Sequence, residues 1–167
     1  MDVLTKEQRH KNMQNIHSKD TSIELLLRRA LWHKSVRFRV NSKDIIGKPD
    51  ISIKKYKLAI FCDGDFWHGN CSDRNIGTNT KYWEQKICRN KERDLELTLT
   101  LRDAGWTVLR FWGSDIKKNP DRVACEILQE IKRIKQQKEL RRQIKEQFAL
   151  NELVILDTDK KHDISSS

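Results

Sequence analysis

The chain has 167 residues, enough for one domain with a buried core. Lys and Arg number 34 against 24 Asp and Glu, so the formal net charge is +10, and apolar residues make up only 37% of the sequence. No run of about 18 apolar residues is present, and the polar N-terminal segment lacks the apolar core of a secretory signal. We therefore expect a protein that neither spans a membrane nor is secreted, and whose charge attracts a polyanion. Nucleic acid is the first candidate partner, ahead of an acidic protein or a membrane surface.

The first half of the chain is predicted to place one helix before three strands. Residues 1–17 are basic and polar, which is typical of an arm or a short helix. Asp20 or Thr21 can cap a helix whose apolar positions run from Ile23 to Leu31. Three strands are predicted from alternating or continuous apolar character, with a hairpin turn before the last: residues 36–40, 50–53 and 58–62.

The second half is predicted to add a helix, a strand and a longer helix. A polar loop over residues 63–79 leads into a helix over 82–104, which Gly105 ends. A strand follows over 106–112, and Pro120 opens a helix that reaches about Ala149, before a flexible tail. This order predicts an α/β fold with a central mixed sheet of about four strands, in which three strands form a meander and a helical crossover leads to the fourth.

Two acidic residues stand at the ends of neighbouring predicted strands. Asp50 opens one strand after the breaker Gly47-Lys48-Pro49, and Asp63 closes the next. If these strands are antiparallel, both carboxylates reach one edge of the sheet, where they repel each other unless a cation joins them. Hard oxygen ligands of this kind suit Mg²⁺. Taken singly, Asp50 is equally interpretable as a strand-entry residue and Asp63 as a turn residue.

Further candidates surround this corner. Phe66 and Trp67 are large aromatics in a polar loop, where they either pack back on the core or wedge between DNA base steps. His68 can reach the same corner as a general acid or base, or it is a solvated loop residue. Glu24 lies within an apolar helix and either faces solvent or supports the metal site. One face of the predicted long helix carries polar side chains that meet phosphates or are simply solvated: Lys86, Asn90 and Arg93.

Short motifs along residues 5–135 resemble those of the very-short-patch-repair (Vsr) DNA mismatch endonucleases, in order and in spacing. They are KNMQNI at 11–16, TSIE at 21–24, GKPD at 47–50, IFCDGDFWHG at 60–69, YWEQKI at 82–87, RNKERD at 89–94 and GWTVLRFW at 105–112. Each motif alone is weak, but their succession is specific. The resemblance implies a restriction-endonuclease-like fold and Mg²⁺-dependent hydrolysis of one DNA strand beside a T:G mismatch.

The resemblance also implies roles for individual residues. Asp50 corresponds to the central metal ligand, and Cys62 to the position whose backbone carbonyl binds the metal. His68 corresponds to a catalytic histidine, and Glu24 to a helix carboxylate that supports the metal waters or another histidine. Phe66, Trp67 and Trp83 correspond to intercalating aromatics, and Met13 and Ile16 to an arm that enters the DNA from the other groove. The expected parts are an arm over 1–17, an endonuclease domain over 18–150 and a tail over 151–167.

The sequence departs from the family pattern at two places. Asp63 stands where the best-known member has a second catalytic histidine, which favours direct metal ligation, so the candidate catalytic residues are Asp50, His68, Asp63 and Glu24. The ligands of the family's structural zinc are replaced by Asp65, Asn70 and Ser114, and Cys71 is the one soft ligand left there. Because tetrahedral zinc needs about four N or S ligands, we expect no such zinc site.

We therefore predict a Mg²⁺-dependent nicking endonuclease of double-stranded DNA, most directly for T:G mismatches, with Lys48, Lys86 and Arg93 neutralising phosphates. The alternatives are a sequence-specific nicking, restriction-type or mobile-element endonuclease, and a non-catalytic DNA-binding module. Whether one or two metals bind, and whether His68 is acid or base, stays open. We expect a cytoplasmic, nucleoid-associated monomer with repair or restriction–modification partners, whose four cysteines form no C-x-x-C pair and stay reduced.

Overall fold

A computed structural model of the chain describes residues 5, 7–8, 19–65 and 80–164. The chain forms two compact units, Met1–Ile127 and Leu128–Ser167. The first unit holds the sheet and the candidate site. Among the helices of the described ranges, none combines the length and the apolar character that a membrane crossing requires.

The sheet has four strands in the order β1-β2-β3-β4: Arg39–Val40, Ile51–Ile53, Leu58–Asp63 and Thr107–Trp112. The first three strands are antiparallel neighbours, and β4 is parallel to β3. The predicted meander with a crossover to a fourth strand is therefore confirmed. Ile51 pairs with Ile60, so Asp50, which directly precedes β2, lies beside the last residues of β3, where the N–H of Cys62 donates to its carboxylate. The turn between these strands is a 3₁₀ helix, Lys54–Tyr56, followed by Lys57 in the left-handed region at φ 47°.

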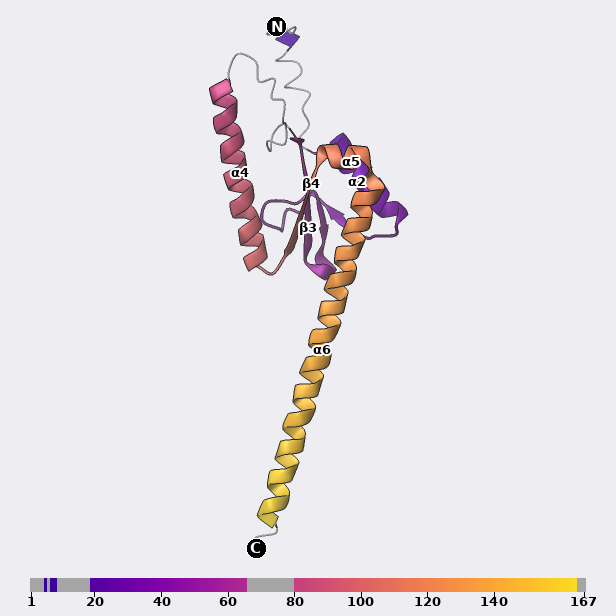
Figure 1. Ribbon diagram of the computed structural model, residues 1–167, viewed down its shortest axis with the longest axis vertical. Coiled ribbons are helices and arrows are strands. Elements are labelled where there is room, and N and C mark those ends of the chain that lie inside the picture. Colours follow the sequence, from indigo (N-terminus) through magenta and orange to yellow (C-terminus); the bar gives the residue numbers. More distant parts are fainter. Residues whose placement is uncertain (1–4, 6, 9–18, 66–79, 165–167) are drawn as a thin grey trace. The chain divides into compact units, whose positions relative to one another are not determined.

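Helices cover both faces of this sheet. Figure 1 shows α4 (Thr80–Asp103) on one side, and α2 (Ser22–His33) with α5 (Gly113–Lys118) on the other. Leu97 and Leu101 of α4 pack with Phe61 and Val108 in the core of the first face. Because side chains alternate along a strand, Phe61 and Asp63 point to the α4 face and Cys62 to the opposite one. The architecture is the α/β arrangement with flanking helices expected from the sequence.

Three elements differ from the sequence prediction. The first strand is only two residues long. Val36 does not belong to it, because its N–H donates to the carbonyl of Leu31 and closes the end of α2. Ser35 makes this reversal in the left-handed region at φ 56°. α5 has no counterpart in the prediction, since six residues are too short to show a helical period. Finally, α6 runs from Pro120 to Ile164, past the end expected at Ala149.

The second unit consists of the continuation of α6. Its basic side chains are partly matched by acidic ones one turn away, as in the pairs Arg133–Glu130 at 2.5 Å and Arg142–Glu139 at 2.9 Å. Such exposed pairs at helical spacing each stabilise a helix by only about 0.2–0.5 kcal/mol.

Candidate active site

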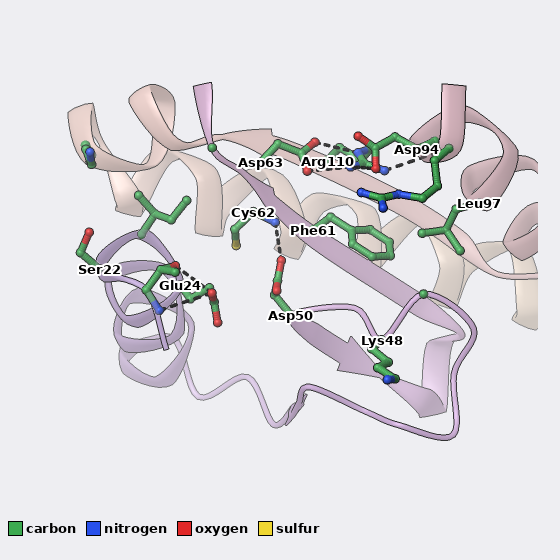
Figure 2. Close-up of a pocket in the computed structure, with 16 residues that line it drawn as sticks. Ser22, Glu24, Lys48, Asp50, Phe61, Cys62, Asp63, Asp94, Leu97 and Arg110 are labelled. Carbon is green, nitrogen blue, oxygen red and sulfur yellow. Dashed lines mark hydrogen bonds and ion pairs between the residues drawn. The ribbon is translucent and has the colours of Figure 1, made fainter. Parts of the chain in front are cut away.

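An open pocket of about 730 Å³ lies where β3 ends, between α2, α4 and the loop that precedes β2 (Figure 2). It gathers charged side chains of both signs, and most of the residues that the sequence singled out and the structure describes line it. The charged lining residues are Glu24, Lys48, Asp50, Asp63, Arg93, Asp94, Arg110 and Lys117. The predicted convergence of Asp50 and Asp63 on one region of the sheet edge is therefore observed.

The loop before β2 holds Asp50 at the pocket. Gly47 has φ +76° and faces α4 so closely that an added Cβ would lie 2.4 Å from the methyl groups of Leu97. Lys48 is also left-handed at φ 48°, and Pro49 is buried. The backbone N–H of Cys62 donates to Asp50 Oδ2 at 2.8 Å, which fixes the carboxylate beside the C-terminal end of β3. The turn formed by Gly47, Lys48 and Pro49 therefore places Asp50 at the sheet edge in one orientation.

Among the described residues, Asp50 is the carboxylate of this pocket that forms no ion pair. It accepts a hydrogen bond from the N–H of Cys62, and the charge of Arg28 acts on it only at a distance. Burial raises the pKa of Asp50 to about 6, against the hydrogen bond from Cys62 that lowers it, and the charges of Glu24 and Asp63 raise it further. A site that disfavours an anion in this way gains when a cation enters.

The Cys62 thiol takes no part in the pocket's charge balance. Burial, and then the charges of Asp50, Glu24 and Asp63, raise the pKa of this thiol well above its usual range. It therefore stays protonated at neutral pH and is a poor nucleophile or metal ligand. What Cys62 can offer a cation is its backbone carbonyl.

Glu24 closes the N-terminus of α2. Its Oε1 accepts hydrogen bonds from the hydroxyl of Thr21 at 2.7 Å and the N–H of Thr21 at 3.4 Å. Its Oε2 accepts from the N–H of Asp20 at 3.2 Å and from Arg28 at 2.5 Å. The side chain is 4% exposed. A carboxylate has about four acceptor positions, so Glu24 is saturated by its own helix. Support for metal waters would require one of these contacts to open.

Asp63 faces a guanidinium. Arg110 of β4 donates from Nε to Oδ2 and from Nη2 to Oδ1, both at 2.7 Å, which is a bidentate pair (Figure 2). The same guanidinium reaches α4, where Nη2 lies 3.1 Å from Asp94 Oδ1 and Nη1 donates to the Asp94 carbonyl at 3.4 Å. Its central carbon stands 5.0 Å from the centre of the Phe61 ring. Direct ligation of a metal by Asp63 would therefore compete with Arg110.

The expected DNA-contacting residues of α4 divide into two groups. Arg93 lines the pocket and donates to Asn90 Oδ1 at 3.3 Å. Trp83 and Lys86 lie nearer the start of the helix, with the Lys86 ammonium 5.2 Å from the centre of a Trp83 ring. The remaining candidates fall outside the described residues: Met13, Ile16, Phe66, Trp67, His68, Asn70 and Cys71.

Comparison with known proteins assigns the family. Residues 1–74 match the family model described as DNA mismatch endonuclease Vsr. The type II nicking enzyme V.NmeDIP of Neisseria meningitidis serogroup C is 47% identical over 79% of this chain and 91% of its own. The DNA mismatch endonuclease Vsr of Escherichia coli K12 is 36% identical over 77% of this chain and 86% of its own. The chain belongs to the Vsr family. The type II nicking enzyme V.HpaIIP of Haemophilus parainfluenzae is 45% identical over 76% of this chain and 93% of its own. The protein is thus a DNA endonuclease, and the resemblance seen in the motifs is confirmed.

Two positions of the zinc site that the Vsr family resemblance implies are adjacent in this structure. The hydroxyl of Ser114 donates to Asp65 Oδ1 at 2.6 Å, so the start of α5 is joined to the segment after β3 by a hydrogen bond. An added Cβ on Gly113 would lie 3.1 Å from the same carboxylate. Across the described ranges, no group of three or more His, Cys, Asp or Glu side chains is arranged to hold a metal ion.

Sequence reasoning missed two arginines of this Vsr-family site. Arg110 interrupts the apolar strand 107–112 on the face that alternation assigns to the core, which is itself a signal that the residue has a buried acidic partner. Arg28 lies four residues after Glu24 on α2, the spacing at which opposite charges meet on a helix.

Proposed function

We propose that this endonuclease cleaves one strand of duplex DNA at T:G mismatches, as the first step of very short patch repair, and that it requires Mg²⁺. The observation that carries the proposal is Asp50: an oriented, half-buried carboxylate with no ion pair among the described residues, in an open pocket that also contains Lys48 and Arg93. A phosphodiester needs such a combination, because its charge must be matched by cations while water attacks.

The donor set suits Mg²⁺. This ion takes one or two carboxylates and keeps several waters, so Asp50 with the Cys62 carbonyl is sufficient to hold it. The chemistry supplied by a divalent cation here is polarisation of the phosphate and activation of a water. Asp50 binds and orients, Lys48 and Arg93 face the phosphate backbone, and His68 transfers a proton as acid or base.

Recognition rests on the aromatic residues of the family motifs. Phe66, Trp67 and Trp83 separate base steps beside the mismatch, and Met13 with Ile16 enters from the other groove. A mismatched step is cheaper to unstack than a matched one, which is a physical source of selectivity. We place this activity in the cytoplasm at the nucleoid, carried out by a monomer that meets repair or restriction–modification proteins on the DNA.

Strand nicking on a duplex panel tests the function. T:G duplexes, other mismatches and the matched sequence are compared with Mg²⁺ and with EDTA, and Asp50→Asn is the inactive control. We expect one strand of the T:G duplex to be nicked when Mg²⁺ is present, and no nicking of the other duplexes or in EDTA. Equal cleavage of the matched duplex would contradict mismatch repair, and cleavage in EDTA would contradict the metal.

A second candidate is sequence-specific nicking of matched DNA. It is favoured by the names of two relatives, both type II nicking enzymes, which are 47% and 45% identical to this chain, whereas E. coli Vsr is 36% identical. Varying the bases around the nick separates the two candidates. Cleavage that depends on flanking sequence and not on the T:G pair would support the second.

Cation binding is expected to depend on pH through Asp50. Its folded-state pKa is about 6, so the carboxylate is mostly ionised at pH 7 and mostly protonated at pH 5. With Mn²⁺ as the probe cation, the affinity should therefore fall roughly tenfold when the pH is lowered from 7 to 5, whereas a carboxyl of ordinary pKa would cause little change. Titration of the metal-free protein measures this. Because an imidazole titrates in the same range, the dependence must persist in His68→Gln. A flat response in that variant would contradict the assignment to Asp50.

Lys48 and Arg93 are expected to contribute salt-dependent DNA affinity. Each contact with a phosphate releases counterions, so Lys48→Ala and Arg93→Ala should each lower the slope of log K against log salt by about one. Binding is measured in Ca²⁺ to limit cleavage. Lys43→Ala, an exposed lysine outside the pocket, is the matched control. An unchanged slope in the two pocket variants would exclude them from the phosphate contacts.

A further inference from the structure

Arg110 joins three elements at the end of β3. Its fork holds both oxygens of Asp63 on β3 at 2.7 Å, and its remaining N–H groups reach the carboxylate and the carbonyl of Asp94 on α4. The pair is well shielded, because the Asp63 side chain is 9% exposed and that of Arg110 22%. Charge-assisted bidentate pairs are among the most directional contacts in proteins, so this one fixes orientation as well as charge.

Asp63 and Asp50 therefore differ in what their carboxylates bind. Both side chains line the pocket, but Arg110 holds the Asp63 carboxylate toward α4, whereas the Asp50 carboxylate accepts a hydrogen bond from one backbone N–H. The alternation along β3 supports this division, because Asp63 lies on the α4 face of the sheet together with Phe61, over which Arg110 is stacked. Asp63 could reach a cation beside Asp50 only by leaving both donors.

The contacts between Arg110 and α4 affect the position of Arg93, the residue of α4 that we propose contacts the phosphate. Asp94 is the neighbour of Arg93 and lies one turn from Leu97, and all three line the pocket. Leu97 is also the side chain against which Gly47 packs, three residues before Asp50. Fixing Asp94 therefore fixes the part of α4 that carries Arg93 relative to the loop that carries Asp50.

We propose that Arg110 is a positioning residue for cleavage: it holds Asp63 out of the coordination sphere of the cation at Asp50 and anchors α4, so that Arg93 meets the phosphate in register. The inference rests on the proposed function. It assigns Asp63 a structural partner in place of a metal, and it leaves Asp50 as the only side-chain ligand of the cation among the described residues.

Asp63→Asn separates ligation from positioning. Mn²⁺ binding is measured by titration in the absence of DNA, and single-turnover nicking is measured on the T:G duplex. We expect the Mn²⁺ dissociation constant to stay within about threefold of the wild type, while the nicking rate falls roughly 10- to 100-fold, as it does when an outer partner of a site is lost. Weakening of Mn²⁺ binding by more than about tenfold would identify Asp63 as a ligand and overturn the proposal.

Arg110→Lys separates geometry from charge. Lysine keeps the positive charge but cannot donate the two parallel bonds to Asp63. We expect the single-turnover rate to fall roughly tenfold or more, with the Mn²⁺ and DNA dissociation constants within about threefold of wild type, because misplacement affects the reacting geometry most. Arg122→Gln is the matched control, since Arg122 also pairs with two carboxylates, Asp115 and Glu126, but stands outside the pocket. A full rate in Arg110→Lys would overturn the proposal.

Folding and the parent function are checked in the same series. Unfolding temperatures are recorded for every variant, and rates are compared well below each transition, so that a merely structural role would lower stability without slowing the folded enzyme. Wild type that fails to bind Mn²⁺ or to nick, or Asp50→Asn that still nicks, would contradict the proposed function itself. Failure of the Arg110 proposal leaves those two results intact.

Discussion

Asp50→Asn is expected to abolish nicking and, at the same time, to make the metal-free protein more stable at pH 8. Nicking should fall by about 10³-fold or more, because the cation that offsets transition-state charge loses its ligand. Stability should rise because the fold disfavours the ionised carboxylate. The shift from the usual pKa of 3.8 to about 6 corresponds to a penalty on the order of 2–3 kcal/mol. Asparagine removes that penalty, and its amide oxygen can still accept the Cys62 N–H.

The sign follows from proton linkage. A carboxyl whose pKa is raised on folding binds its proton more tightly in the folded state, so its unfavourable effect is absent below pH 4 and complete above about pH 6. Urea unfolding of metal-free wild type and Asp50→Asn at pH 4 and pH 8 measures this: the variant should gain at pH 8 only. Mg²⁺ should then stabilise the wild type and leave the variant unchanged.

The control for this experiment is Asp44→Asn. Asp44 is exposed and pairs with Lys54, outside the pocket, and that hydrogen bond holds the pKa of its carboxyl below the usual value. This variant should keep full nicking and gain nothing at pH 8. A loss of stability in Asp50→Asn at pH 8 would mean that the carboxylate has a favourable partner in the free protein, and the argument for an open cation site would fail.

The convergence of Asp50 and Asp63 could be predicted from the sequence because it depends only on strand order and direction. A breaker before one strand and an acidic residue after the next suffice, once the two strands are antiparallel. What each carboxylate contacts could not be predicted in the same way. The partner of Asp63 comes from β4, 47 residues later, and depends on the parallel register that sets Arg110 beside Phe61. Long-range pairing of this kind leaves no local pattern.

The contacts of Glu24, unlike those of Asp63, could have been predicted, because they are local and follow a known sequence pattern. Thr21-Ser22-Ile23-Glu24 has the spacing of a capping box, in which the glutamate returns to the N-cap residue. Reading Glu24 only as a helix position that faces solvent or the metal overlooked this. Phe66, Trp67 and His68 lie outside the described residues, so the roles assigned to them remain predictions.

Glu24→Ala is expected to cost about 1–3 kcal/mol of folding free energy, because the shielded Arg28 guanidinium loses one of its two carboxylate partners and keeps only the exposed Asp20. The Arg28 side chain is 11% exposed, and its Nε already makes no hydrogen bond within the described part of the chain. Removing Glu24 also deprives Thr21 and Asp20 of the acceptor for their N–H groups at the start of α2. Urea or thermal unfolding at neutral pH measures the loss, which should lower the unfolding temperature by roughly 5 °C.

A double variant isolates the charge contribution. In Glu24→Ala/Arg28→Met no buried cation remains, so the double variant should be more stable than Glu24→Ala alone, with the lost cap leaving a cost of about 1 kcal/mol. If Glu24 acts only through α2, the double variant should also recover nicking, because α2 again presents an ordered edge to Asp50. If stability returns but nicking stays low, Glu24 acts directly on the metal-bound waters. In that case it must release at least one of the four contacts that it makes in the free protein. Equal destabilisation of the single and double variants would show that the Arg28 charge is not the source of the cost.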